Sequence, residues 1–467
     1  MHRRRFLHLA GLSLPALPAP AASRRLSDLD VRMPLEQRIR FIESWVHENY
    51  FDNLGLMYSH WLFDQERAST PADYDPRTRF SIGVEPHDHN NYENSPMISG
   101  IFLAAQCYRY RATKEPAALE YAARAFRSID VNFRLSEGRA GAAAPLTQRS
   151  GHIDPNDRFE TRVGWISKPY GQMMTTQTST EQNFGPVWGM YCYRPLAPPE
   201  TRRRIDFMIA SIARLWREMR YTISFFGEPW SFEQSMPRAQ RHMPVWAWIN
   251  RIAFELTGDP QFQKEFERIH ALFGAMPSAL ETNHGMGRRR YISTEDRAFH
   301  DKEIVTADIL IDLNPAAAGQ YVSSMEKWWE FAGLGMRPDF FSYYYIDLDT
   351  VTREWRPSKK TLKPRPLWDS PWMFSNGTFP VASGEYAARR VMSAAMVARR
   401  STRLRDTAKE FARQVFAVLD KSHLRYMIDP ENSLEPEIRY LANLLSGDCL
   451  AMYPAAYWYG RTHGIWT

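Results

Sequence analysis

The residue types best suited to catalysis stand at the start of a strongly apolar, aromatic segment. Ser179-Thr180-Glu181-Gln182 opens the run STEQNFGPVWGMYCY, whose composition and spacing predict a helix. A carboxylate in the first turn of a helix that borders a cavity can serve as a general acid, a general base or a nucleophile. Ordinary capping is the alternative interpretation, because Ser or Thr at the N-cap followed by an acidic residue also stabilises a helix end.

A denser polar cluster, EPHDHNNYEN at residues 85–94, comes directly before a second apolar helical pattern. So many polar side chains cannot all pack in a core, and we expect some of them to face a solvated cavity at the helix N-terminus. A surface turn with capping residues is the alternative. His87 and His89 would lie on one face of an extended segment, as metal ligands do, but no distant third ligand can be identified, and no metal is predicted.

Glycoside hydrolysis is the chemistry that these carboxylates fit best. It needs one carboxylic acid to protonate the leaving oxygen and a second carboxylate to activate water or attack the sugar. We predict Glu181 as one of the pair and Asp88 or Glu93 as the other. Asp296, in the acidic segment TEDR before a further helical pattern, is the remaining catalytic candidate.

Aromatic rings, amides and arginines are the side chains that could hold a sugar. Aromatic residues make up 13% of the chain, and most of them should be in the core, so the better candidates stand on predicted loops. Arg288 could bind a uronate carboxylate, although an exposed basic loop explains it equally well. The predicted substrate-binding residues are His87, Tyr92, Trp165, Tyr170, Gln182, Trp230, Arg288 and Trp372.

Helical periodicity dominates the chain that must position these residues. Short polar turns such as TGDP at residues 257–260 join successive helices in antiparallel pairs. The predicted helices cover residues 34–50, 96–112, 116–133, 181–194, 198–219, 237–256, 260–273, 297–313, 318–334, 384–400, 402–420, 434–446 and 448–463.

Two long connections interrupt the helices. Residues 134–180 are polar and Gly-rich, and residues 336–382 are rich in Pro and aromatic residues. Within the second connection, residues 341–346 and 351–355 predict a small β-hairpin. Long structured connections in a compact domain usually carry function, which favours a site bordered by these segments.

Several of these segments carry a family resemblance. Residues 92–105, YENSPMISGIFLAA, and the helix start Ser179-x-Glu181-Gln182 with Gly185 and Gly189 resemble inner helices of the six-hairpin glycosidase-like (α/α)6 barrels. The acidic residue of the helix start is usually Asp in related sequences, and here it is Glu181. The segment YWYGRTHG at residues 457–464 is similar to a C-terminal helix of uncharacterised members. The resemblance covers most of residues 34–465. It implies an all-α (α/α)6 toroid that acts on carbohydrate, in a fold that hosts both hydrolases and lyases.

The N-terminus has the pattern of an export signal. Arg3-Arg4-x-Phe6-Leu7 is followed by an apolar stretch at residues 9–17 and by Ala19-Pro20-Ala21, which suits cleavage. We predict a twin-arginine-type signal peptide at residues 1–22, with an ordinary secretory signal as the alternative, and a barrel domain at residues 23–467. This predicts a periplasmic or secreted protein.

Composition excludes several other classes. Without the arginines of the signal the net charge falls from +6 to about +3, and the basic clusters are short, so no nucleic-acid partner is predicted. No segment reaches the roughly 18 consecutive apolar residues of a membrane span. Three scattered cysteines predict free thiols rather than disulfides or a cysteine zinc site. No Gly-rich nucleotide-binding motif stands between a strand and a helix, and no cofactor is predicted.

Three functions fit these residues. The preferred one is a glycoside hydrolase acting on oligosaccharides, including uronate-containing ones. The first alternative is a polysaccharide lyase, in which Tyr or His removes a proton while Arg, Asn or His neutralises the substrate carboxylate. The second is a non-catalytic sugar-binding protein. The polar cluster before every second helix predicts that the helix starts near Pro96, Glu181, Pro237 and Arg297 lie on one rim of the toroid. Neither the sugar nor the oligomeric state follows from the sequence.

Overall fold

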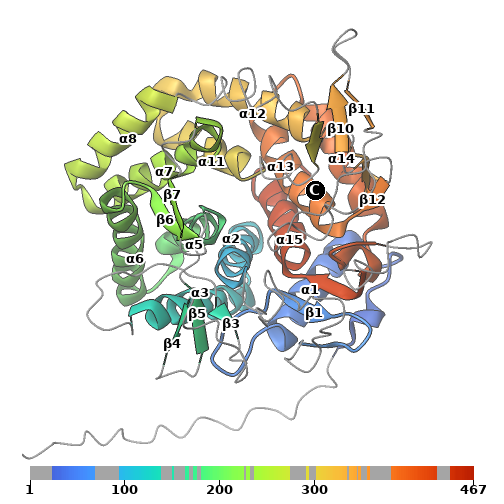
Figure 1. Cartoon of the computed structure of the whole chain (residues 1–467). Helices are drawn as coiled ribbons and strands as arrows, with labels where there is room; N and C mark the ends of the chain where they lie inside the picture. The colour runs from blue at the N-terminus through green and yellow to red at the C-terminus, as the bar shows by residue number, and fades with distance from the viewer. Residues whose placement is uncertain are drawn as a thin grey trace, which may run out of the picture.

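The structure is a computed structural model, and twelve α-helices arranged as two concentric rings dominate the part of the chain that it describes (Figure 1). The described residues are 24–68, 94–137, 150–151, 164–167, 172–175, 180–225, 228–231, 236–273, 291–293, 301–333, 336–343, 345–348, 355–357, 380–428 and 442–466.

Six helices form the inner ring. They are α2 (Ser95–Thr113), α5 (Thr180–Tyr193), α7 (Met236–Thr257), α11 (Asp301–Leu313), α13 (Gly384–Arg400) and α15 (Gly447–Thr462). Each contacts the next in this order, and α15 contacts α2, so the ring is closed. Nearly every residue of α2, α5 and α15 is buried, as expected for helices surrounded by protein on all sides.

Six outer helices cover the inner ring. They are α1 (Leu35–Asn49), α3 (Pro116–Glu137), α6 (Pro199–Glu218), α8 (Pro260–Phe273), α12 (Ala318–Ala332) and α14 (Arg405–Val418). These helices are amphipathic: α6 buries Ile205, Ile209 and Trp216 on one face, while Phe207 on another is half exposed. Four 3-10 turns, at Leu26–Asp28, Arg194–Leu196, Pro315–Ala317 and Lys421–Leu424, complete the described helical structure.

Helices α2 and α5 approach each other backbone to backbone. A Cβ atom at Gly100 would lie 2.0 Å from the carbonyl of Gly185, and one at Gly189 would lie 2.3 Å from the carbonyl oxygen of Gly100. Only glycine allows this approach, because any side chain would overlap the facing backbone. The three glycines therefore fix the start of α5 against α2.

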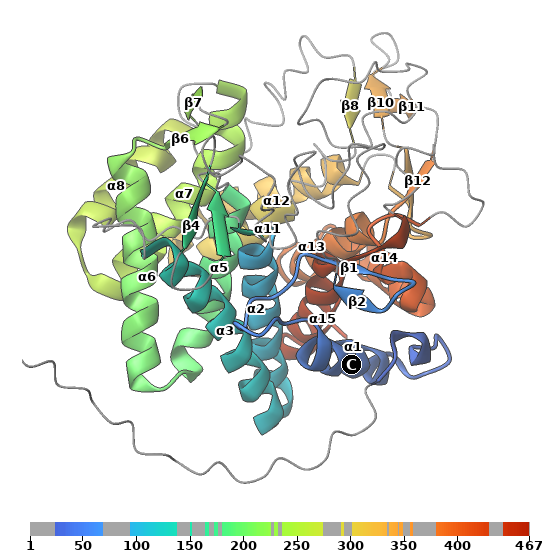
Figure 2. The same ribbon diagram turned by 60° about the horizontal axis from the view of Figure 1, so that its bottom comes forward.

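Short antiparallel strands fill the connections that lead from outer to inner helices. The sheets have the orders β13-β1-β2, β3-β5-β4, β6-β7, β11-β10-β8 and β12-β9. Their bounds are β1 His60–Leu62, β2 Arg67–Ala68, β3 Ser150–Gly151, β4 Gly164–Ser167, β5 Gln172–Thr175, β6 Thr222–Phe225, β7 Glu228–Ser231, β8 Tyr291–Ser293, β9 Phe341–Tyr343, β10 Tyr345–Leu348, β11 Trp355–Pro357, β12 Pro380–Ala382 and β13 Leu444–Ser446. Strands β5, β7, β8, β12 and β13 each precede an inner helix. Strands β6 to β12 accordingly lie at one end of the helical ring (Figure 2), and we call this end the start rim.

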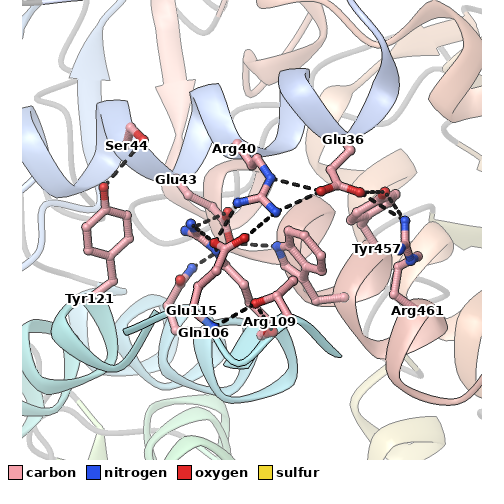
Figure 3. Close-up of polar contacts among 12 residues, drawn as sticks. Glu36, Arg40, Glu43, Ser44, Gln106, Arg109, Glu115, Tyr121, Tyr457 and Arg461 are labelled. Carbon is pink, nitrogen blue, oxygen red and sulfur yellow. Dashed lines mark hydrogen bonds and ion pairs between the residues drawn. The ribbon is translucent and has the colours of Figure 1, made fainter. Parts of the chain in front are cut away.

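At the end of the ring opposite the start rim, charged side chains join α1 to α2, to the start of α3 and to α15 (Figure 3). Buried Glu43 of α1 accepts hydrogen bonds from Gln106 Nε2 at 2.7 Å and from Trp458 Nε1 at 2.8 Å, and Arg109 lies 3.2 Å from its other oxygen. Arg109 also donates to Glu115 at 2.7 Å. This charge network joins helices from both ends of the chain and so stabilises the closed ring.

Further charged contacts extend this network along α1. Arg40 binds both carboxylate oxygens of Glu115 at 2.6 Å and bonds Glu36 at 2.8 Å. Glu36 in turn accepts hydrogen bonds from Tyr457 at 3.1 Å and from Arg461 at 2.9 Å. We call the set Glu36, Arg40, Glu43, Gln106, Arg109, Glu115, Tyr457, Trp458 and Arg461 the seam.

The all-α toroid and most of the predicted helices are confirmed, with boundaries that shift by a few residues. One prediction is wrong in part: residues 444–446 of the predicted helix 434–446 form strand β13, because they pair with His60–Leu62. Ser446 stands at the N-cap position of α15. The predicted hairpin is present as β10 and β11, but Phe341–Tyr343 forms a separate strand that pairs with β12. Residues 1–22 lie outside the described part. None of the described helices is long and apolar enough to cross a membrane.

Candidate functional site

Glu181 and Gln182 are the two predicted site residues whose side chains the structure describes. Trp165 and Trp230 belong to strands β4 and β7, where their backbones pair with Met174 and Ile223 and their side chains are not described. The other predicted site residues lie outside the described residues: His87, Asp88, Tyr92, Glu93, Tyr170, Arg288, Asp296 and Trp372.

Glu181 stands in the first turn of α5 and forms an ion pair with Lys302, the second residue of α11. Both side chains are mostly buried, with exposed fractions of 14% for Glu181 and 6% for Lys302. Lys302 reaches past α7, since α7 lies between α5 and α11 in the inner ring. The pair therefore holds a carboxylate in a definite position at the start rim, and Glu181 does more than cap its own helix.

Further hydrogen bonds tie the neighbouring helix starts together. Gln182 Nε2 donates to Asn94 Oδ1 at 2.8 Å, and Asn94 directly precedes α2. Thr180 Oγ1 bonds the buried His242 Nδ1 of α7 at 2.8 Å. With the ion pair to Lys302, these contacts confirm that the starts of α2, α5, α7 and α11 gather on one rim, as the polar cluster before each of them predicted.

A second charged cluster occupies the same rim at the starts of α13 and α15. Arg389 Nη2 donates to Glu385 at 2.7 Å and to Asp448 at 2.6 Å, and so joins two carboxyl groups from different helices. Ser446 Oγ donates to the second oxygen of Glu385 at 3.2 Å. The exposed fractions of the side chains are 9% for Glu385, 13% for Arg389 and 2% for Asp448. We call these four residues the Glu385 cluster.

Burial dominates the electrostatics of this cluster. It raises the pKa of Glu385 to about 8; Arg389 opposes the rise, and the Asp448 carboxylate adds to it. Burial and the two nearby carboxyl groups also raise the pKa of the Cys449 thiol, and burial together with Asp448 raises that of Tyr50. A raised carboxyl pKa of this kind favours the protonated form, which is the form that a general acid needs.

Ser59 links the Glu385 cluster to the first one. Its hydroxyl accepts a hydrogen bond from the backbone N–H of Asn94 at 2.6 Å. Its carbonyl accepts from the backbone N–H of Gly447 at 3.2 Å and from Tyr50 at 2.9 Å. All six inner helices therefore bring a described polar side chain to the start rim or to its immediate connection. Among the described residues, no three His, Cys, Asp or Glu side chains are placed to hold a metal ion.

Sequence reasoning missed the Glu385 cluster, although a signal for it exists. Residues 383–385 and residues 446–448 read Ser-Gly-Glu and Ser-Gly-Asp, and each triplet opens an apolar inner helix. The shared pattern places a carboxylate at the second position of each helix. Arg389, four residues after Glu385 on the same helix face, is the expected ionic partner.

Comparisons with known proteins bear on the fold alone. No protein-family model matches the chain, and no curated protein matches it significantly. Among solved structures, cellobiose 2-epimerase from Bacillus thermoamylovorans B4167 aligns with a TM-score of 0.50 and 6% identity over 91% of this chain and 99% of that one.

Two other solved structures align over most of the chain. An unsaturated glucuronyl hydrolase specific for heparin has a TM-score of 0.48 and 10% identity over 91% of this chain and 96% of its own. An endoglucanase from the termite Nasutitermes takasagoensis has a TM-score of 0.43 and 10% identity over 81% of this chain and 87% of its own. The closed ring of six inner and six outer helices, together with the epimerase alignment, shows that the chain has the fold of the six-hairpin (α/α)6 barrels.

Proposed function

We propose that this protein is a carbohydrate-active enzyme, a glycoside hydrolase that acts on oligosaccharides at the start rim. One observation carries the proposal: Glu181, on the start of α5, is held by Lys302 from α11. The residues on either side of it, Thr180 and Gln182, bond an imidazole of α7 and the amide that precedes α2. Contacts that tie the start of α5 to three other helix starts fit a site that must hold a reacting group in a fixed position.

Sugar cleavage gives each of these groups a task. The Glu181 carboxylate would activate water or attack the anomeric carbon, and the Lys302 ammonium would hold it in place. Amide groups such as those of Gln182 and Asn94 are the side chains that bind sugar hydroxyls, because each offers both a donor and an acceptor. Asp88 and Glu93 remain our proposed partners from the segment that leads into α2, and Asp296 from the one that leads into α11.

The substrates that we propose include uronate-containing oligosaccharides. The motivation is the run Arg288-Arg289-Arg290 in the connection before α11, since an arginine fork can bind a carboxylate through two hydrogen bonds. The proposed location is outside the cytoplasm, in the periplasm or the medium, because the N-terminal segment has the twin-arginine pattern.

Product analysis tests the proposal directly. The purified protein is incubated with neutral and with uronate-containing oligosaccharides, and reducing ends and near-ultraviolet absorbance are followed together. A hydrolase produces new reducing ends without absorbance, whereas a lyase produces both, because its product carries a double bond. Binding in calorimetry without any new reducing end would identify a non-catalytic sugar-binding protein and reject the proposal.

A further inference from the structure

The Glu385 cluster contains an oxygen atom that its charged form leaves unpaired. Asp448 is buried, and its Oδ2 accepts from Arg389, but no donor among the described residues faces its Oδ1. An unpaired buried carboxylate oxygen is costly. Asp448 lies within hydrogen-bond reach of Glu385, so a protonated Glu385 would offer this carboxylate a donor.

Glu385 also lies opposite Glu181 in the inner ring. The inner helices follow the order α2, α5, α7, α11, α13, α15, so α13 stands opposite α5 (Figure 1). Glu385 and Glu181 lie in the first turns of these opposite helices. Glycoside hydrolysis uses two carboxyl groups on either side of the scissile bond, and a sugar bound across the rim would lie between these two.

We propose that Glu385 is the proton donor to the leaving oxygen of the glycosidic bond, in place of the candidates from the segments before α2 and α11. Asp448 and Arg389 are then positioning residues that keep its proton in place. This inference rests on the proposed function. As the bond between the anomeric carbon and the leaving oxygen breaks, the Glu385 proton passes to that oxygen. The hydroxyl of a water molecule adds to the anomeric carbon, the Glu181 carboxylate takes the second proton of that water, and exchange with solvent restores both groups.

Leaving groups of different basicity test this role. Methyl glycosides need a proton on the departing oxygen, whereas 2,4-dinitrophenyl glycosides leave without one. Methyl and dinitrophenyl derivatives of glucose and of glucuronic acid are assayed with the wild type. The sugar that the wild type cleaves is then used for the variants. For Glu385→Gln we expect kcat/KM to fall by about 10²- to 10⁴-fold on the methyl glycoside and by less than about tenfold on the dinitrophenyl glycoside.

Glu326→Gln is the matched control. Glu326 also accepts hydrogen bonds from a serine and an arginine, Ser401 at 2.5 Å and Arg403 at 2.9 Å, but it belongs to outer helix α12. We expect this control to cleave both glycosides at the wild-type rate. Equal losses on the two substrates by Glu385→Gln, or no loss on either, would reject the role of Glu385 while leaving the proposed function intact.

The wild-type pH profile supplies a second test that needs no variant. Activity on the methyl glycoside should fall above about pH 8, as Glu385 loses its proton, and activity on the dinitrophenyl glycoside should not. The groups that set this limb are Arg389 on α13, Asp448 and Cys449 on α15, and Ser446 on β13. A limb that is the same for both substrates would contradict the inference.

Asp448→Asn separates positioning from a merely structural role. The Asp448 carboxylate raises the pKa of Glu385, so the variant should move the alkaline limb of the methyl glycoside profile to lower pH. A lower rate with an unmoved limb would show that Asp448 does not act through Glu385. If the purified protein releases no reducing ends from the oligosaccharides, the proposed function is wrong, and this inference falls with it.

Discussion

The ion pair between Glu181 and Lys302 joins two helices that are not neighbours in the inner ring. Glu181→Gln keeps the size of the side chain but removes its charge and its capacity to act as a base. We expect activity to fall by about 10²-fold or more, since positioned acid–base catalysis contributes about 10²- to 10⁴-fold. The free energy of unfolding should also fall, by about 1.5–3 kcal/mol, because Lys302 then loses a charged hydrogen-bond partner in a buried position.

A double variant distinguishes the two effects. Glu181→Gln with Lys302→Met removes both charges, so most of the lost stability should return while activity stays low. Chemical denaturation gives the stability of each variant, and reducing-end assays give the activity. Full activity in the single variant would leave Glu181 with a structural role only.

Residues differ in how much their sequence neighbours reveal. The position of Glu181 and Gln182 at a helix start could be predicted because both belong to one short motif. Glu385 and Asp448 are 63 positions apart, and their contact depends on Arg389 and on the packing of α13 against α15. No local sequence pattern reveals that these two residues are close in space, or that Glu385 is buried deeply enough to raise its pKa.

At the scale of elements, the glycine contact between α2 and α5 sets the spacing of the start rim. Gly100→Ala places a methyl group 2.0 Å from the backbone of Gly185, and neither helix can move without separating the rim. We expect a loss of about 3 kcal/mol or more in the free energy of unfolding, at the upper end of overpacking effects. Thermal and denaturant unfolding measure it.

Gly319→Ala is the control for this substitution. Gly319 lies in the first turn of α12, and a Cβ atom there would meet nothing within 4 Å. Alanine should stabilise that helix slightly, by up to about 1 kcal/mol. Comparable losses at both positions would mean that close packing between α2 and α5 is not the cause.

Most helices could be predicted because each has a strong 3.6-residue period and a polar turn at its end. The strands could not be predicted in the same way, because each is only two to four residues long and depends on a partner far along the chain. Leu444–Ser446 illustrates the difference: its apolar residues continue a helical pattern, but its backbone pairs with His60–Leu62. The two strands can pair only because α2 and α15, which follow them, are neighbours in the closed ring.

At the scale of the whole molecule, the seam makes stability depend on pH in two opposite ways. Burial raises the pKa of Glu43 to about 7, whereas hydrogen bonds from Arg40 and Arg109 lower that of Glu115 to about 2. Glu43 binds its proton more tightly in the folded state, so its contribution to stability declines as the pH rises from about 4.5 to about 7. Glu115 contributes stability above about pH 4.5, which is lost as the pH falls toward 2.

Two substitutions separate these contributions. Relative to the wild type, Glu43→Gln should gain stability as the pH rises from 5 to 8, while Glu115→Gln should gain stability as the pH falls from 5 to 2. Denaturant midpoints over this pH range give both trends. Parallel curves for the wild type and Glu43→Gln would show that Glu43 has the same proton affinity in the folded and unfolded chains.

The three cysteines predict the redox state of the folded protein. Cys107, Cys192 and Cys449 are all buried and free, and burial raises the pKa of each thiol. We expect thiol reagents to modify none of them quickly in the native protein and all three after denaturation, because the thiolate is the reactive form. A count below three in denatured, unreduced protein would reveal a disulfide.

The seam also has a consequence for the time course of folding. Glu36 and Arg461 are 425 positions apart, whereas hairpins such as α2–α3 and α7–α8 are made by neighbouring segments. The entropic cost of closing a loop grows slowly with its length, by about 0.6 kcal/mol per doubling. The long separation therefore affects when the seam can form during folding more than how stable it is. Until α15 has been synthesised, the flanks of α2 and α13 that it covers stay open to water. We therefore expect a ribosome-bound chain that has not yet reached residue 447 to expose two apolar edges, which favour aggregation and chaperone binding until α15 is made.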